Sequence, residues 1–179
     1  MKLVEFSCEN ELRNLLTRFN ALSNINRASW YEWRQAALEY ARPGVTALDL
    51  VLKAWEISGH DTAKGYLNML DKTSKTFLED VAKAIVFSST MMGETAKVVK
   101  GEKPNEVFVR WDRCPWPEFA RRYEVPMEED VLGCDKWFQT VIEDVNRFFN
   151  TRIKLETTKA IPRGHGMCVR RLSLLSEEK

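Results

Sequence analysis

Apolar side chains recur at the spacing of an α-helix through the first hundred residues. Residues 9–22 carry one such stripe of period 3.6, made up of Leu12, Leu15, Leu16, Phe19 and Leu22. The same spacing predicts five helices, with limits near 9–22, 29–41, 46–58, 61–70 and 74–99. The region 1–103 is therefore expected to be helical.

Turn and capping residues set the expected limits of these helices. Asn26–Ser29 is interpreted as a turn, since Ser29 and Glu32 form the capping-box pattern that starts a helix. Thr46 is expected to cap the third helix, and Ser58-Gly59 is interpreted as its end. Gly93 is expected either to bend the fifth helix or to end it early.

The pattern changes from a helical period to a strand period after the boundary at Lys100–Asn105. Val107, Val109 and Trp111 occupy alternate positions, which predicts a strand. The elements expected beyond it are helices near 118–123 and 126–150 and a hairpin of strands near 151–158 and 167–174. The predicted class is α+β, with an N-terminal helical layer followed by a β-α-α-β-β unit with a small antiparallel sheet. The α+β region 104–179 is expected to pack on region 1–103 as one compact unit.

Charge and composition narrow the classes of partner. The 27 basic and 26 acidic residues leave a net charge of +1, which gives no reason to expect nucleic acid or an anionic membrane as a partner. Arg163, Arg170 and Arg171 are interpreted as a solvated strand face. With no signal peptide and no long apolar segment in view, a cytoplasmic protein with reduced thiols is expected.

The scarce reactive residues gather in the last third of the chain, each beside a chain-bending residue. They are Cys114, Cys134, His165 and Cys168. If the fold brings them together, they form either a metal site, for zinc or iron, or a thiol nucleophile with an imidazole base. If it does not, they are ordinary buried thiols. Cys134 is either part of a helix stripe or, if Gly133 breaks the chain, an activated thiol at a helix N-terminus.

Other candidates surround these thiols. Trp116 lies between two prolines and is expected to line a ligand pocket beside Cys114. Glu118 and Asp135 are the carboxylates proposed as general base or metal ligand. The remaining carboxylates near the thiols are expected to be solvated residues in the first turns of helices, and they include Glu128, Glu129 and Asp130.

Three motifs in this region resemble a known family. They are Val131-Leu132-Gly133-Cys134-Asp135, Phe149-Asn150 before a strand, and Gly164-His165-Gly166-Met167-Cys168. The chain is similar to the L-2-amino-thiazoline-4-carboxylic acid hydrolase-like proteins, in an uncharacterised prokaryotic branch. The resemblance implies an intracellular protein with a small-molecule pocket that opens a heterocycle containing sulfur and nitrogen. It also implies functional roles for Cys134, Asp135 and Cys168.

Three functions follow as alternatives. The first is a small-molecule-binding protein, and if it is an enzyme, a hydrolase of a small heterocyclic or amide substrate. In that case Cys134 or a metal-bound hydroxide attacks the substrate, and His165 or Asp135 handles the proton. The second is a non-catalytic metal-binding sensor or structural module. The third is a homo-oligomer whose tryptophan-rich helices form the interface and which has no small-molecule site.

Overall fold

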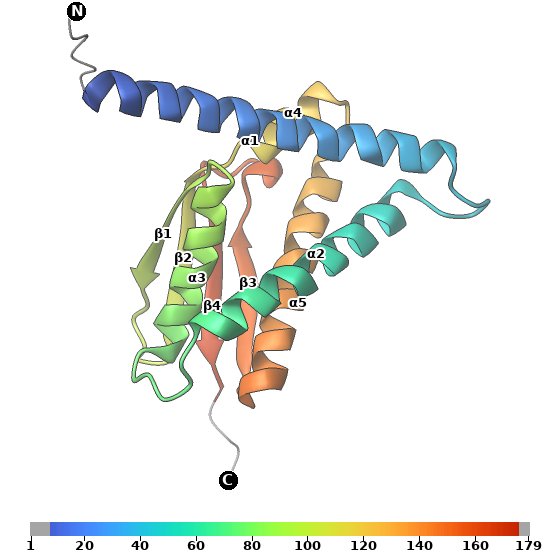
Figure 1. Ribbon diagram of the computed structural model, residues 1–179. Helices are drawn as coiled ribbons and strands as arrows, with labels where there is room; N and C mark the ends of the chain where they lie inside the picture. The colour runs from blue at the N-terminus through green and yellow to red at the C-terminus, as the bar shows by residue number, and fades with distance from the viewer. Residues whose placement is uncertain (1–7, 176–179) are drawn as a thin grey trace, which may run out of the picture.

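The computed structural model describes residues 8–175 and confirms the α+β class. Three helices come first along the chain, and all the strands of the described residues follow them (Figure 1). In chain order the elements are α1 (Cys8–Glu39), α2 (Ala47–Met69), α3 (Phe77–Met91), β1 (Thr95–Lys100), β2 (Glu106–Arg113), α4 (Trp116–Arg122), α5 (Met127–Phe149), β3 (Ile153–Lys159), the short 3₁₀ helix η1 (Ile161–Arg163) and β4 (Cys168–Leu174).

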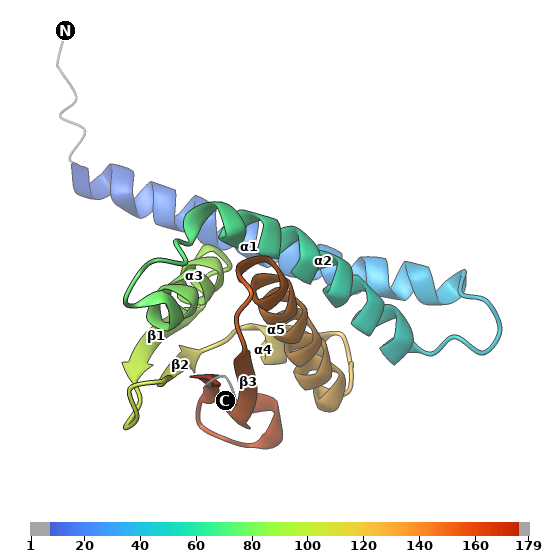
Figure 2. The ribbon, with the colours of Figure 1, turned by 90° about the horizontal axis from the view of Figure 1, so that it is seen from below.

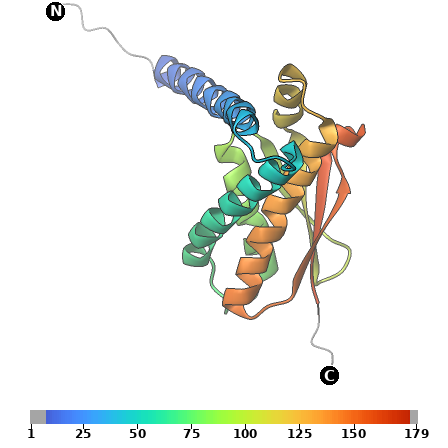
Figure 3. The same cartoon turned by 90° about the vertical axis from the view of Figure 1, so that its right-hand side faces the viewer.

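The four strands form one antiparallel sheet in the order β1-β2-β4-β3. The hairpin predicted between the last two strands is confirmed, with Leu155 opposite Leu172. Helix α3 packs on β1 and β2, and α5 packs on β3. The helices lie on one side of the sheet (Figure 3), while α1 crosses the end of the molecule (Figure 2). No helix within residues 8–175 is both long and apolar enough to cross a bilayer.

The fifth predicted helix ends at Met91, just before Gly93, which is one of the two outcomes expected at this glycine. The segment after it, predicted as helix up to residue 99, is strand β1. Gly93 has a positive φ of 74°, which turns the chain out of the helix. Beyond it Ala96 and Val98 are half-buried while Lys97 is exposed, which is the alternation of a strand. The prediction that region 1–103 is wholly helical is therefore wrong, because β1 pairs with β2 of the second region.

The turn predicted at Asn26–Ser29 is also wrong, because α1 runs through it without a break. Arg27, inside the predicted turn, is only 2% exposed. Its guanidinium lies over the rings of Trp116 (5.9 Å) and Phe119 (5.7 Å) and donates to the carbonyl of Met92. These tertiary contacts hold the segment in the helix, and local capping chemistry does not decide its conformation.

The break predicted at Ser58-Gly59 is absent, and α2 continues to Met69. Gly59 instead allows α2 and α5 to approach closely, since a Cβ at this position would lie 2.8 Å from Cβ of Thr140. The start of α2 follows the prediction. Thr46 accepts a hydrogen bond from the backbone N–H of Asp49, which completes a capping box.

Two apolar clusters fill the interior. The larger lies between the sheet and the helices α3 and α5, and its fully buried side chains include Val81, Ile85, Val109, Val141 and Leu172. The smaller lies between α1 and α4 and contains Tyr31, Trp116, Phe119, Ala120 and Val125. Residues of both clusters border the candidate site described next.

Candidate functional site

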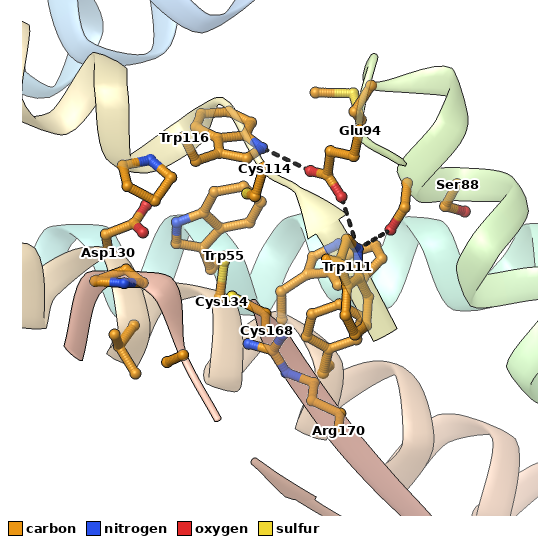
Figure 4. Close-up of a pocket in the computed structure, with 18 of the residues that line it drawn as sticks. Trp55, Ser88, Glu94, Trp111, Cys114, Trp116, Asp130, Cys134, Cys168 and Arg170 are labelled. Atoms are coloured by element: carbon orange, nitrogen blue, oxygen red, sulfur yellow. Dashed lines mark hydrogen bonds between the residues drawn. The ribbon is translucent and has the colours of Figure 1, made fainter. Parts of the chain in front are cut away.

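A cavity of about 330 Å³ opens where the two apolar clusters meet. Its walls come from α2, α3, β2, α4, α5 and β4, so segments far apart in sequence border it (Figure 4). A volume of this size falls in the range of small-molecule sites, which are mostly apolar with a few polar groups. The cavity is therefore the candidate site for ligand binding.

Aromatic rings form much of the cavity wall. Trp55 of α2 meets Trp116 edge to face, with ring centroids 5.5 Å apart. Trp111 of β2 meets Phe138 of α5 in the same way at 5.4 Å. The sequence prediction placed Trp116 in a pocket wall beside Cys114, and both residues border this cavity. Such rings offer flat apolar surfaces to a planar ligand.

All three cysteines chosen from the sequence border the cavity. Cys114 follows β2, Cys134 lies in the middle of α5, and Cys168 begins β4. Helix α5 is unbroken at Gly133, so Cys134 is not at a helix N-terminus. Burial raises the pKa of all three thiols, which keeps them protonated at neutral pH. Protonated thiols are poor nucleophiles, because the thiolate is the reactive form.

The other predicted site residues lie outside the cavity wall. His165 is exposed on the turn before β4, and its Nδ1 is 3.0 Å from the carbonyl oxygen of Ala160. Glu118 is exposed on α4. Within residues 8–175 no group of three or more His, Cys, Asp or Glu side chains is arranged to hold a metal ion. The predicted set of three thiols and one imidazole is thus not assembled around one point.

Asp135 does not border the cavity, but it is hydrogen-bonded to Arg170, which does. The Asp135 carboxylate accepts hydrogen bonds from Thr157 Oγ1 (2.6 Å) and from Arg170 Nη2 (3.0 Å). The guanidinium of Arg170 stacks over Phe138 at 4.1 Å and Trp111 at 5.2 Å. The interpretation of Arg170 as a solvated residue is wrong, because only 6% of its side chain is exposed.

Arg170 keeps one donor without a protein partner. Its buried Nε finds no hydrogen-bond acceptor among the described residues. Leaving a buried donor of a charged group unpaired is unfavourable by roughly 1–3 kcal/mol or more. Because Arg170 also borders the cavity, its positive charge favours an anionic group, such as a carboxylate, in a bound ligand.

Glu94, between α3 and β1, supplies a buried carboxylate at the cavity. The indole N–H of Trp111 donates to its Oε2 at 2.9 Å, and the indole N–H of Trp116 donates to its Oε1 at 3.0 Å. Burial raises the pKa of Glu94, and these hydrogen bonds oppose that rise. Glu94 thereby fixes two rings of the cavity wall.

Asp130, in the first turn of α5, is the most perturbed carboxyl group at the cavity. Burial raises its pKa to about 7, the nearby Glu94 and Glu129 add to the rise, and Arg170 opposes it. The expectation that Glu129 and Asp130 are solvated is wrong for both. Glu129 is buried in a two-bond ion pair with Arg34, at 2.5 and 2.8 Å.

Figure 4 shows how these groups are distributed. Asp130 and Glu94 lie on opposite sides of the three cysteines, and Arg170 reaches the cavity from β4. The sequence reasoning missed the roles of Glu94, Asp130 and Arg170. For Arg170 a signal existed, because it alternates with Cys168 and Leu172 and must therefore face the same side of the strand.

The fold and the cavity define a class of protein: a small α+β domain with an aromatic pocket between its helical layer and its sheet. The chain belongs to the L-2-amino-thiazoline-4-carboxylic acid hydrolase family, whose sequence profile matches residues 25–172. This confirms the resemblance drawn from the three motifs. No curated protein is significantly similar to the sequence.

One solved structure shares the fold at low sequence identity. A trafficking protein particle complex subunit 3 from Naegleria fowleri, covalently bound to palmitic acid, superimposes with a TM-score of 0.55 and 14% identity. The similarity covers 88% of this chain and 97% of that one. The phenol-responsive sensory domain of the transcription activator PoxR, solved with phenol, gives a TM-score of 0.49 at 14% identity, over 86% of this chain and 76% of that one.

Proposed function

We propose that this protein binds a small, planar, carboxylate-bearing molecule in the aromatic cavity and hydrolyses it. The observation that carries the proposal is one cavity bordered by both Asp130, with a pKa of about 7, and the cationic side chain of Arg170. A group that titrates near neutral pH can accept and return a proton within one catalytic cycle. Membership of the hydrolase family supports the same reaction class.

In this proposal Arg170 and the aromatic rings position the substrate. The guanidinium of Arg170 attracts the substrate carboxylate, and the indoles of Trp55 and Trp111 cover the faces of the ring. Asp135 holds the guanidinium through its bond to Nη2, which fixes the orientation of the arginine beside the cavity. The arginine side chain is therefore already fixed in one conformation before the substrate binds.

Asp130 is assigned the proton transfer. Its carboxylate removes a proton from a water molecule as the water oxygen forms a bond to the electrophilic ring carbon. The ring bond from that carbon to sulfur or nitrogen then breaks, and the departing atom takes the proton from the Asp130 carboxyl group. The net change is the addition of one water molecule to the substrate, and Asp130 returns to its starting state.

The pair of Cys134 and His165 proposed from the sequence has less support. His165 does not border the cavity, and burial raises the pKa of the Cys134 thiol. Asp130 is therefore preferred as the group that handles the proton. Cys134 remains a candidate for a covalent step only if Asp130 serves as its base, since both border the same cavity.

The test uses L-2-amino-thiazoline-4-carboxylic acid, the compound in the family's name. We expect the purified protein to quench its tryptophan fluorescence on binding and to yield a product heavier by one water. Asp130→Asn should bind with similar affinity but lose at least 100-fold in turnover. Arg170→Met should lose binding. Glu118→Gln, on the outer surface of α4, is the control and should change neither.

Three other outcomes would each contradict one part of the proposal. Full turnover by Asp130→Asn removes Asp130 from the mechanism. Unchanged affinity in Arg170→Met removes the carboxylate contact. If Cys134→Ser abolishes turnover while Asp130→Asn does not, the thiol mechanism replaces the one proposed.

A second candidate function is the holding of an acyl chain. The favouring observation is that three thiols border a mostly apolar cavity, and a protein of similar fold carries covalent palmitic acid. A cavity thiol would attack the thioester of palmitoyl-coenzyme A, forming a protein thioester and releasing the coenzyme thiol. Intact-protein mass spectrometry after incubation with that donor would detect the added acyl group, and an unchanged mass would reject this function.

A further inference from the structure

The first half of α1 carries an exposed apolar stripe, here called the leucine stripe. Its members are each more than half exposed, and they are Leu12, Leu15, Leu16, Leu22 and Ile25. The second half of the helix contains the buried residues Arg27 and Tyr31, which anchor it to the body. In Figures 1 and 2 the first half extends past the other helices. The match to the hydrolase family begins at residue 25, after most of the stripe.

The spacing of the stripe fits a second helix as its partner. Leu12, Leu15, Phe19 and Leu22 follow intervals of three, four and three residues, which is the seam of a two-stranded coiled coil. Leu16 and Ile25 flank this seam and add apolar surface to it. The remaining side chains of this half are mainly short and uncharged, so nothing bulky prevents two such helices from packing.

The charges beside the seam favour a second copy in antiparallel orientation. Glu9 and Glu11 lie at the start of the helix, whereas Arg18 lies two turns further along. When two copies cross near Leu15, Glu11 of each copy lies beside Arg18 of the other. Parallel pairing would instead align like charges at equal heights. The arrangement thus has the two-fold self-complementarity that a symmetric dimer requires.

A lipid surface fits the same stripe less well. Helices that lie on membranes carry many lysine and arginine residues on the polar face. The first half of α1 has Arg13 and Arg18 but also Glu9 and Glu11, and Glu9 pairs with Arg13 at 3.6 Å. Its charges therefore cancel, and they provide no attraction to anionic lipid.

We propose that the protein forms an antiparallel homodimer through the first half of α1. A half-exposed leucine offers roughly 50 Å² of apolar area, so the stripe offers about 250 Å² on each copy. With a polar rim the pair buries roughly 800–1,000 Å² in total, which is the size of a weak or transient interface. The dimer should therefore dissociate in the micromolar range. The proposal is independent of the reaction assigned to the cavity.

The experiment is sedimentation equilibrium of the full chain across low to high micromolar concentrations. We expect a monomer–dimer equilibrium in the wild type. Leu15→Lys should raise the dimer dissociation constant by roughly 100-fold or more, because one change removes a central contact from both copies. Phe148→Lys is the matched control. Phe148 is equally exposed, at 64%, but lies on α5, and its replacement should leave the dimer unchanged.

Charge exchange tests the orientation. Glu11→Arg alone should weaken the dimer severalfold, and the double change Glu11→Arg with Arg18→Glu should restore it. A wild type that stays monomeric at every concentration overturns the proposal, and so does a dimer that Phe148→Lys disrupts and Leu15→Lys does not. Failure of the double change to restore the dimer overturns the antiparallel orientation. Co-sedimentation of the wild type, but not of Leu15→Lys, with neutral phosphatidylcholine vesicles would assign the stripe to a lipid surface instead.

Discussion

The indole of Trp55 lies directly against the α-carbon of Gly133. A Cβ built at Gly133 would be 2.6 Å from Cδ1 and 2.7 Å from Nε1 of the Trp55 ring. Only a residue without a side chain allows α5 to pass this close to α2. The position of one wall of the cavity therefore depends on a glycine that lies directly before Cys134.

Gly133→Ala is expected to displace Trp55 and to destabilise the protein by roughly 1–3 kcal/mol, as other overpacked interiors do. It should also weaken ligand binding in the cavity. Urea denaturation and ligand titration followed by tryptophan fluorescence measure the two effects. Gly65→Ala is the control, since Gly65 lies near the C-terminal end of α2 and nothing is within 4 Å of its Cβ position. That change should stabilise the helix by up to about 1 kcal/mol.

Asp130→Asn is expected to stabilise the protein at neutral and alkaline pH. The pKa of Asp130 is about 7 in the folded protein and near 4 in the unfolded chain. Between these values only the unfolded chain releases the proton, so the wild type loses free energy of unfolding as pH rises from 4 to 7. The loss is at most about 4 kcal/mol and is complete above pH 7.

The neutral asparagine has no such loss. The advantage of Asp130→Asn should be near zero at pH 4, should grow up to pH 7 and should then stay level. Urea unfolding at a series of pH values measures it. A constant difference between the two proteins at every pH would contradict the raised pKa of Asp130.

Glu94→Gln is expected to destabilise the protein and loosen the cavity wall. The carboxylate accepts from the indole N–H groups of both Trp111 and Trp116, one at each oxygen. A glutamine amide has only one oxygen, so one indole N–H would face the amide nitrogen. Trp111 keeps Ser89 Oγ as an acceptor at 2.9 Å, whereas Trp116 would be left without one, at roughly 1–3 kcal/mol. Thermal unfolding measures the change. Glu102→Gln, on the exposed turn between β1 and β2, serves as the comparison and should have little effect.

The cavity thiols are expected to react slowly in the folded protein. Burial raises the pKa of Cys114, Cys134 and Cys168, and only the thiolate reacts with a disulfide reagent. In a Cys8→Ser background, an aromatic disulfide reagent at pH 8 should label the three thiols far more slowly than in denaturant. A ligand in the cavity should slow the labelling further. Rapid labelling of all three in the native state would refute their burial.

Element types followed from sequence where local pattern and tertiary packing agree. The alternation of Val107, Val109 and Trp111 predicted β2, and the capping box of Thr46 and Asp49 marks the start of α2. Predictions failed where a residue with local turn chemistry serves a tertiary contact. Gly59 permits α5 to approach instead of ending a helix, and Arg27 is held inside α1 by the rings of α4.

The site was predicted only in part for a related reason. The scarce aromatic and thiol side chains chosen from the sequence, such as Trp116 and Cys134, border the cavity as expected. The charged residues were misjudged, because first-turn carboxylates are usually solvated and nothing in the local sequence marks Asp130 as an exception. Its burial depends on how α5 sits against α4 and β4.

The sequence by itself determined the class of fold, the family and the thiols that line the interior, because periodicity and motifs are local properties. Only the tertiary structure decided which charges enter the cavity. Burial and distance between Asp130, Glu94 and Arg170 arise from separate segments meeting, and the energy of a charge depends on those surroundings.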